Sequence, residues 1–315
     1  MVENNSFIKD LMLEFSLSED HFRRLVVRAP HTYKVYNIPK KSGGARTIAQ
    51  PAKETKYLQA WLLKNKLCKL PVSKCASAYR VGSSIKKNAL AHVRNEYILK
   101  MDFANFFNSI SRSQVERHLI HELLLSVPEA EIVSKLVCVK YKNSQSECLS
   151  VGAPSSPLIS NSIMYEFDLL IDKWCSDNEV TYTRYADDLV FSTNVKGLTN
   201  IVEGTAREIL ASCKNISLKF NDRKTTHLSK RHHRSITGLT ISNESKVTLG
   251  RNRKRDISKC IFLYSKNLLA QNEIDSLQGI LGFAMHIEPL FVMKMGRKYG
   301  DALLSEIFKH RKNRK

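Results

Sequence analysis

The chain has 315 residues, 43% of them hydrophobic, which is enough for two or three subdomains around more than one core. Its net charge of +20 favours a polyanionic partner, nucleic acid before an anionic membrane surface. No apolar stretch approaches the ~20 residues that span a bilayer, and no signal peptide is recognisable. The seven cysteines, without a Cys-x-x-Cys pair, argue against a disulfide framework and a zinc ribbon and suit the cytoplasm.

The first hundred residues predict helices followed by a basic hairpin. Ser18, before Glu19 and Asp20, has the pattern of a helix N-cap with an acidic first turn. Tyr33–Pro39 and Arg46–Ile48 are expected strands, joined by a Lys- and Gly-containing turn over 40–44. Such a hairpin can fold over a triphosphate, although by itself the pattern also describes a plain surface hairpin.

Three carboxylates follow predicted strands. The alternating segment Tyr97–Phe103 contains Asp102 near its end, and Asp187 and Asp188 lie at the bend between two runs of strand formers. A solvated Asp-Asp turn is the alternative for Asp187 and Asp188. Three acids from neighbouring strands can instead hold two Mg²⁺ ions ~4 Å apart, the spacing of two-metal nucleotidyl transfer.

The second half of the chain is strongly basic. Between Lys214 and Lys259 there are thirteen Lys or Arg residues and three acids. Leu218–Phe220 is an expected strand, and 235–241 with 246–249 an expected hairpin. From Arg253 onward, apolar residues at helical spacing predict a small helical bundle with a basic exterior.

The order of these motifs resembles reverse transcriptases of the right-hand polymerase fold, and most closely the retron reverse transcriptases of bacteria, over nearly the whole chain. The general motifs lie at Arg46–Ile48 with Pro51, Asp102–Ile110, Gly152–Asn161, Tyr185–Asp188, Lys224 and the region of Gly238. Two stretches are similar to retron elements in particular, Asn88-Ala89-x-x-His92 and Ile236-Thr237-Gly238. One departure is Val151, where many reverse transcriptases carry Gln, and this puts a side-chain contact to nucleotide or template in doubt.

The resemblance implies an α+β fold with fingers, a ferredoxin-like or RRM-like palm and a helical thumb. The expected boundaries are 1–96 for the N-terminal helices and fingers, to which 112–150 also contribute. The palm is expected over 97–249, and the thumb with its basic tail over 250–315.

The resemblance also implies the site. Asp102, Asp187 and Asp188 would be the catalytic carboxylates, holding two Mg²⁺ ions together with the Phe103 carbonyl. Phe107 falls at the steric-gate position, where a phenyl ring collides with a ribose 2′-hydroxyl. The remaining residues expected to bind the deoxynucleoside triphosphate (dNTP) are Arg46, Gly152, Ala153 and Lys224. Those expected to contact nucleic acid are Asn88, His92, Arg184, Thr237, Gly238, Arg251, Arg253, Lys254 and Arg255.

The implied activity is RNA-directed DNA synthesis on a cognate structured non-coding RNA. Priming from a guanosine 2′-hydroxyl would give a branched RNA–DNA product, msDNA, used in anti-phage defence with an effector protein. No membrane partner is expected, and a higher-order oligomer is left open. Two alternatives remain, a group II intron-type or other bacterial reverse transcriptase and a non-catalytic RNA-binding scaffold. The expected end of the chain soon after the thumb weighs against the first, and three intact acids weigh against the second.

Overall fold

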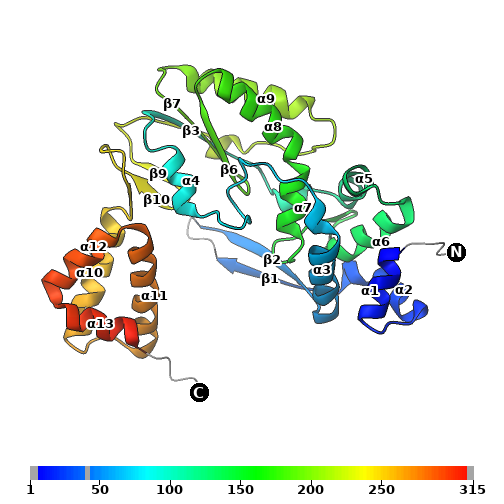
Figure 1. Ribbon diagram of the computed structural model, residues 1–315, viewed down its shortest axis with the longest axis horizontal. Helices are drawn as coiled ribbons and strands as arrows, with labels where there is room; N and C mark the ends of the chain where they lie inside the picture. The colour runs from blue at the N-terminus through cyan, green and yellow to red at the C-terminus, as the bar shows by residue number, and fades with distance from the viewer. Residues whose placement is uncertain (1–5, 40–42, 311–315) are drawn as a thin grey trace. The chain divides into compact units, whose positions relative to one another are not determined.

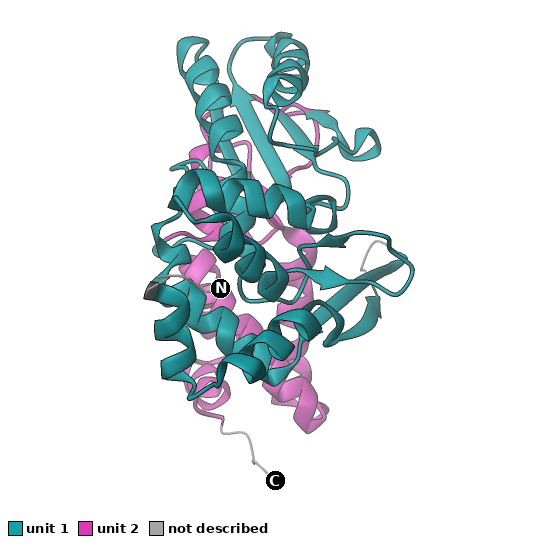
Figure 2. Ribbon diagram, turned by 90° about the vertical axis from the view of Figure 1, so that its right-hand side faces the viewer, with its two compact units in different colours: residues 1–82, 99–227 teal, residues 83–98, 228–315 magenta. Residues whose placement is uncertain are grey.

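The computed structural model describes residues 6–39 and 43–310 and combines helices with small antiparallel sheets (Figure 1). The chain forms two compact units, shown in Figure 2. Unit 1 takes its residues from 1–82 and 99–227, and unit 2 from 83–98 and 228–315. Within the described residues, no helix is both long and apolar enough to cross a membrane.

Unit 1 begins with two helices and the predicted hairpin. Helix α1 spans Ser6–Glu14 and α2 spans Glu19–Arg28. The Ser18 side chain accepts a hydrogen bond from the His21 backbone N–H, as expected of an N-cap. Strand β1 (Tyr33–Pro39) pairs antiparallel with β2 (Ala45–Pro51), which confirms the hairpin; turn residues 40–42 lie outside the described residues. The short η1 (Ala29–His31), α3 (Lys53–Asn65) and η2 (Leu67–Lys69) complete this part.

A four-stranded sheet forms the centre of unit 1. Its strands are β3 (Tyr97–Asp102), β6 (Thr181–Tyr185), β7 (Asp188–Thr193) and β8 (Thr226–Leu228). Their spatial order is β6-β7-β3-β8. With the strands ranked along the chain, this is the order two-three-one-four of a ferredoxin-like sheet, as predicted for the palm. Helices α8 (Tyr165–Asp177) and α9 (Leu198–Ser212) pack beside it (Figure 1).

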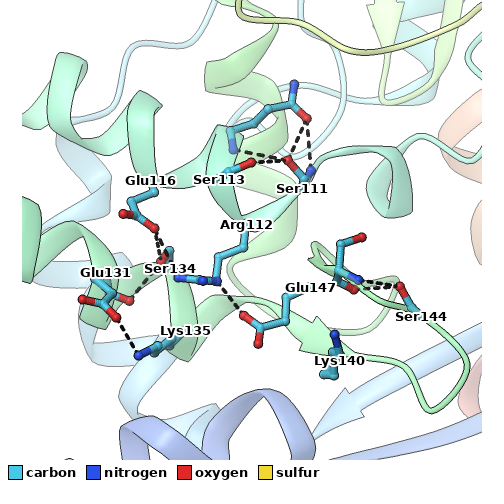
Figure 3. Close-up of polar contacts among 12 residues, drawn as sticks. Ser111, Arg112, Ser113, Glu116, Glu131, Ser134, Lys135, Lys140, Ser144 and Glu147 are labelled. Carbon is cyan, nitrogen blue, oxygen red and sulfur yellow. Dashed lines mark hydrogen bonds and ion pairs between the residues drawn. The ribbon is translucent and has the colours of Figure 1, made fainter.

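Ion pairs connect the helices that follow β3 with a short hairpin. The helices are α5 (Arg112–Leu123), α6 (Val127–Val137) and α7 (Ser156–Ile163); the hairpin between the last two is β4 (Val139–Lys140) and β5 (Glu147–Cys148). Arg112 lies 2.6 Å from the Glu147 carboxylate and 3.2 Å from that of Glu116 (Figure 3). Ser134 of α6 donates to Glu116 as well, so one polar cluster joins α5, α6 and the hairpin.

Unit 2 packs α4 (Ile85–Ala91) on a second small sheet and adds a helical bundle. The sheet consists of β9 (Arg234–Ile236), β10 (Leu239–Ile241) and β11 (Val247–Thr248), in the order β11-β10-β9. The bundle consists of α10 (Arg251–Ser265), α11 (Gln271–Ile287), α12 (Pro289–Tyr299) and α13 (Asp301–Lys309). The predicted helical C-terminal region is confirmed.

Two strand predictions need correction. The segment 235–241 is not one strand, because Thr237 and Gly238 both have positive φ (46° and 79°) and turn the chain between β9 and β10. Leu218–Phe220 contributes only a single bridge, between Phe220 and Phe103. The compact units divide the chain elsewhere than at 96 and 249, and the boundaries drawn from the resemblance stay a prediction.

Candidate active site

The sheet brings the three predicted carboxylates together. Asp102 ends β3, and Asp187 and Asp188 lie at the tip of the β6–β7 hairpin, where Tyr185 pairs with Asp188. The Phe103 N–H donates a hydrogen bond of 3.1 Å to the Asp187 carbonyl, so the hairpin tip and the end of β3 are directly joined. Residues 85 positions apart in the chain thereby form one acidic cluster.

A buried arginine supports the hairpin tip. Arg184 and Asp168 are both fully buried, and their closest contact is 2.6 Å. Arg184 also donates to the carbonyl of Ala186, a turn residue with a positive φ of 58° that is strained for any residue with a Cβ. The expectation that Arg184 contacts nucleic acid is therefore corrected: a side chain without exposed surface positions the turn instead. Asp168 was missed because its partner lies 16 residues away on another element.

Lys224 contacts Asp102 from the side of β3 that lies opposite the β6–β7 hairpin. The Asn221 N–H donates to the Asp102 carbonyl over 2.7 Å, and the short helix η4 (Asp222–Lys224) follows. This places the Lys224 ammonium 2.8 Å from each carboxylate oxygen of Asp102. From the sequence Lys224 is expected to bind the triphosphate, whereas its partner in the structure is the carboxylate of Asp102.

Burial and crowding of like charges raise the pKa values of Asp187 and Asp188 at the hairpin tip. Burial, the charges of Asp187 and Asp102 and a hydrogen bond with Asp102 raise the pKa of Asp188 to about 6. Burial and the Asp102 charge also raise the pKa of Asp187, against the opposing effects of Lys224 and Arg46. For Lys224, burial acts to lower the pKa, but the hydrogen bond and charge of Asp102 outweigh it and the pKa is raised. The cluster thus favours an added cation.

The donor set fits a hard divalent cation. Carboxylate and backbone carbonyl oxygens are ligands that Mg²⁺ prefers. A bound cation would offset the burial and the repulsion that together raise the pKa of Asp188. As the side chains stand, no group of three or more His, Cys, Asp or Glu residues within 6–39 and 43–310 is gathered closely enough to hold a metal ion. The Lys224 ammonium contacts both Asp102 oxygens instead.

Aromatic rings pack behind the acids. Phe103 stacks on Phe220 with centroids 4.9 Å apart and on Phe106 at 5.8 Å, and meets Phe167 edge-on. Phe107 begins η3 (Phe107–Ser109), and its half-buried ring meets Phe106 edge-on at 5.3 Å. The strand end that carries Asp102 is therefore held by a rigid apolar cluster, with Phe107 at its margin.

The β1–β2 hairpin contributes charge to the same cluster. Arg46 is exposed on β2, and its positive charge acts on both Asp187 and Tyr79. Tyr79 is 55% exposed with a φ of 59°, and burial, followed by the nearby Asp187 charge, raises its pKa. No sequence motif indicates Tyr79, which is an aromatic residue in a loop before Gly82.

The turn at Gly152 packs against β2. A Cβ at Gly152 would lie 2.9 Å from the Ala49 carbonyl oxygen, and φ is +123°, so only glycine fits. The Ala49 N–H donates to the Val151 carbonyl over 2.8 Å. Ala153 is buried. Val151 thus contacts β2 through its backbone carbonyl. The expected nucleotide contacts of Gly152 and Ala153 stay predictions.

The residues of unit 2 expected to contact nucleic acid differ in exposure. Asn88 and His92 are 1% and 0% exposed, so they are interior residues of unit 2 and the expected direct contact is corrected. Thr237 donates to the Ile85 carbonyl and Arg253 to the Gly238 carbonyl, which ties the stretch Ile236–Gly238 to α4 and α10 within this unit. Lys254 pairs with Glu288 at 2.5 Å. Arg251 and Arg255 are exposed on α10.

Comparisons with known proteins agree with this geometry. Residues 38–241, more than half of the chain, match the family "Reverse transcriptase (RNA-dependent DNA polymerase)". The chain is 36% identical to the retron Ec83 reverse transcriptase of Escherichia coli, over 88% of this chain and 90% of that one. It is 32% identical to the E. coli retron Ec86 reverse transcriptase, over 97% and 93% of the two chains.

Among solved structures, the telomerase of Candida albicans in complex with a fragment of telomeric RNA shares the fold, with a TM-score of 0.53 at 12% identity. The match covers 93% of this chain and 59% of the telomerase. Together with the three carboxylates at adjoining strand ends, these matches confirm the resemblance found in the sequence. The chain belongs to the retron reverse transcriptases, within the family of RNA-dependent DNA polymerases.

Proposed function

We propose that this reverse transcriptase copies part of a cognate structured non-coding RNA, starts from a guanosine 2′-hydroxyl within it, and yields a branched RNA–DNA molecule. The proposal rests above all on the acidic cluster of Asp102, Asp187 and Asp188 at adjoining strand ends of a retron-type chain. A scaffold that only bound RNA would gain nothing from three crowded acids beside a polyanion, since they repel both each other and phosphate.

Each side chain has a role in this reaction that follows from its position. Asp102, Asp187 and Asp188, with the Phe103 carbonyl, would hold two Mg²⁺ ions, which when bound lower the pKa of the attacking hydroxyl and stabilise the pyrophosphate leaving group. Arg46, exposed on β2 with its charge reaching Asp187, would pair with the triphosphate oxygens. Phe107, at the margin of the aromatic cluster, would exclude a ribose 2′-hydroxyl. The nucleotide is then held between fingers hairpin and palm.

The partners follow from charge and family. The basic α10, with exposed Arg251 and Arg255, would bind backbone phosphates of the RNA and of the product duplex. We further propose that the protein acts in the bacterial cytoplasm and that its product serves anti-phage defence together with an effector protein.

The test is nucleic-acid analysis of the protein purified after expression with its flanking locus. The sample is digested with ribonuclease, debranched and run on a denaturing gel. We expect a discrete DNA whose mobility shifts on debranching and which is absent from the double variant Asp187→Ala, Asp188→Ala. The control variant Asp177→Ala, Glu179→Ala removes two exposed acids near the end of α8 and should keep the DNA.

Other outcomes separate the alternatives. DNA without a branch would indicate another class of bacterial reverse transcriptase. RNA alone in the unaltered protein would indicate a scaffold. DNA synthesis by the double variant would disprove the active-site assignment.

A further inference from the structure

The contact between Lys224 and Asp102 uses both oxygens of the first carboxylate. Each oxygen lies 2.8 Å from the Lys224 ammonium, and the Asp102 side chain is only 7% exposed. A nearly buried carboxylate has little water to replace a lost partner. Any metal ion bound by Asp102 therefore competes with the ammonium for the same oxygens.

Hydrogen bonds hold the backbone around Lys224, whereas its side chain is largely exposed. The Asn221 N–H holds the Asp102 carbonyl, and the Lys224 N–H donates to the Asn221 carbonyl over 2.9 Å. Arg207 of α9 contacts the Asp222 carboxylate at 2.7 Å, which anchors η4 from outside. The Lys224 side chain is nevertheless 58% exposed. Its flexible stem can carry the ammonium away from Asp102 without unfolding η4.

The contact of Lys224 with Asp102 also balances charge in the acidic cluster. Asp102, Asp187 and Asp188 lie at adjoining strand ends, and the Lys224 ammonium contacts both oxygens of Asp102, so one positive charge lies against the acidic cluster. A lysine half in water gives only modest stabilisation, so a doubly charged ion arriving with a triphosphate can displace it. The released ammonium then faces the negative charge of the same nucleotide.

We propose that Lys224 is an internal counter-cation: it occupies Asp102 in the metal-free enzyme and exchanges for a divalent ion when the metal–nucleotide complex binds. The inference rests on the proposed function, because it takes Asp102 to be a metal ligand. Its consequence is coupling. Lys224 weakens the binding of free metal and, once released, strengthens nucleotide binding, so metal and dNTP enter together.

The test measures metal binding rather than DNA synthesis. Full-length protein, made without its RNA and treated with nuclease, is titrated with Mn²⁺, and the free ion is followed by electron paramagnetic resonance. We expect Lys224→Met to bind Mn²⁺ about fivefold more tightly than the unaltered protein, because one competing charge is gone. Lys224→Arg should stay near the unaltered value.

The matched control is Arg223→Met, which removes the same charge from the neighbouring exposed position of η4. Its Mn²⁺ affinity should change less than about threefold, since screened charges at a distance contribute little. Equal affinities of Lys224→Met and the unaltered protein would overturn the proposal, and so would equal gains in both Met variants. Circular dichroism and melting curves establish that each variant is folded.

A second titration, with dATP present and no primer, measures the coupling. The nucleotide should tighten Mn²⁺ binding more in the unaltered protein than in Lys224→Met, because only the former releases an ammonium toward the triphosphate. Equal tightening would contradict the exchange. Failure here, with branched DNA still made by the unaltered protein, would reject the counter-cation and leave the proposed function standing.

Discussion

At the scale of single residues, Phe107 is where sugar discrimination can be tested. Its ring is half-buried and braced by Phe106, so it can resist displacement by a ribose. Phe107→Ala should lower the preference for dATP over ATP by roughly 10- to 200-fold, the range for a lost steric exclusion in a pocket. The measurement is the ratio of kcat/KM for the two nucleotides on a primed RNA template. An unchanged ratio would remove Phe107 as the gate.

His92 illustrates how a residue expected at a nucleic-acid surface can act inside the protein. It is fully buried, and burial lowers its pKa to about 3. Below the unfolded-state value of ~6.5 the unfolded chain binds a proton that the folded protein does not, so stability falls as the pH falls. His92 alone should contribute a loss of about 2 kcal/mol between pH 7 and pH 5.

The variant His92→Gln should lack this part of the pH dependence. Urea unfolding at pH 7, 6 and 5 measures the slope of stability against pH, which a general destabilisation by the substitution would leave unaltered. His121→Gln serves as the control, since the His121 side chain is 83% exposed. Parallel slopes for His92→Gln and the unaltered protein would contradict the buried, neutral state of His92.

At the scale of elements, the β6–β7 hairpin depends on the ion pair of Arg184 with Asp168. Both side chains are fully buried, and Tyr182 donates a further hydrogen bond of 2.8 Å to Asp168. Arg184→Met should destabilise the protein by about 3–5 kcal/mol, because it leaves a buried carboxylate without its counter-charge.

The same substitution at an exposed pair provides the comparison. Arg23 contacts Glu19 at 2.6 Å, with the two side chains 60% and 54% exposed, and Arg23→Met should change stability by less than about 1 kcal/mol. Chemical denaturation at pH 7 measures both variants. Similar small losses in the two would mean that Asp168 finds another partner and that the pair does not hold the hairpin.

Two segments show where the sequence pattern predicts a strand that the structure does not contain. The alternation of 235–241 reads as one strand, yet Thr237 and Gly238 adopt positive φ and the segment becomes two paired strands. Leu218–Phe220 has strand composition, but its backbone makes only one bridge, and Phe220 packs on Phe103 instead. In both cases the strand that pairs across the sheet determines the structure of the segment. The periodicity of apolar residues along the chain does not identify that partner.

At the scale of the whole molecule, the basic charge can be tested through the salt dependence of RNA binding. Arg251 and Arg255 are exposed, whereas Arg253 and Lys254 have partners within unit 2. The variant Arg251→Ala, Arg255→Ala should weaken RNA binding and flatten the slope of log affinity against log salt by about 0.7 for each lost phosphate contact.

The control for this measurement is Lys9→Ala, Arg24→Ala, which removes the same charge from exposed positions of α1 and α2. Filter binding to the cognate RNA between low and moderate salt gives the slopes. Equal effects of the two double variants would mean that net charge, rather than α10, determines the affinity.

The sequence by itself determined the family, the helical C-terminal region and the identity of the three carboxylates. These are encoded locally: strand formers around Asp187 and Asp188, an acid closing an alternating run at Asp102, and apolar residues at helical spacing after Arg253. Each motif is local and the family follows from the order of the motifs along the chain, so no knowledge of distant contacts is needed to find them.

Only the tertiary structure decided the partners of these residues. Lys224 at Asp102, Arg184 at Asp168, Gly152 against Ala49 and the burial of Asn88 and His92 all depend on which distant segments meet. The sequence alone does not distinguish a charged residue that faces phosphate from one that faces a buried carboxylate. Burial and pairing, which set its charge state and its role, exist only once the chain has folded.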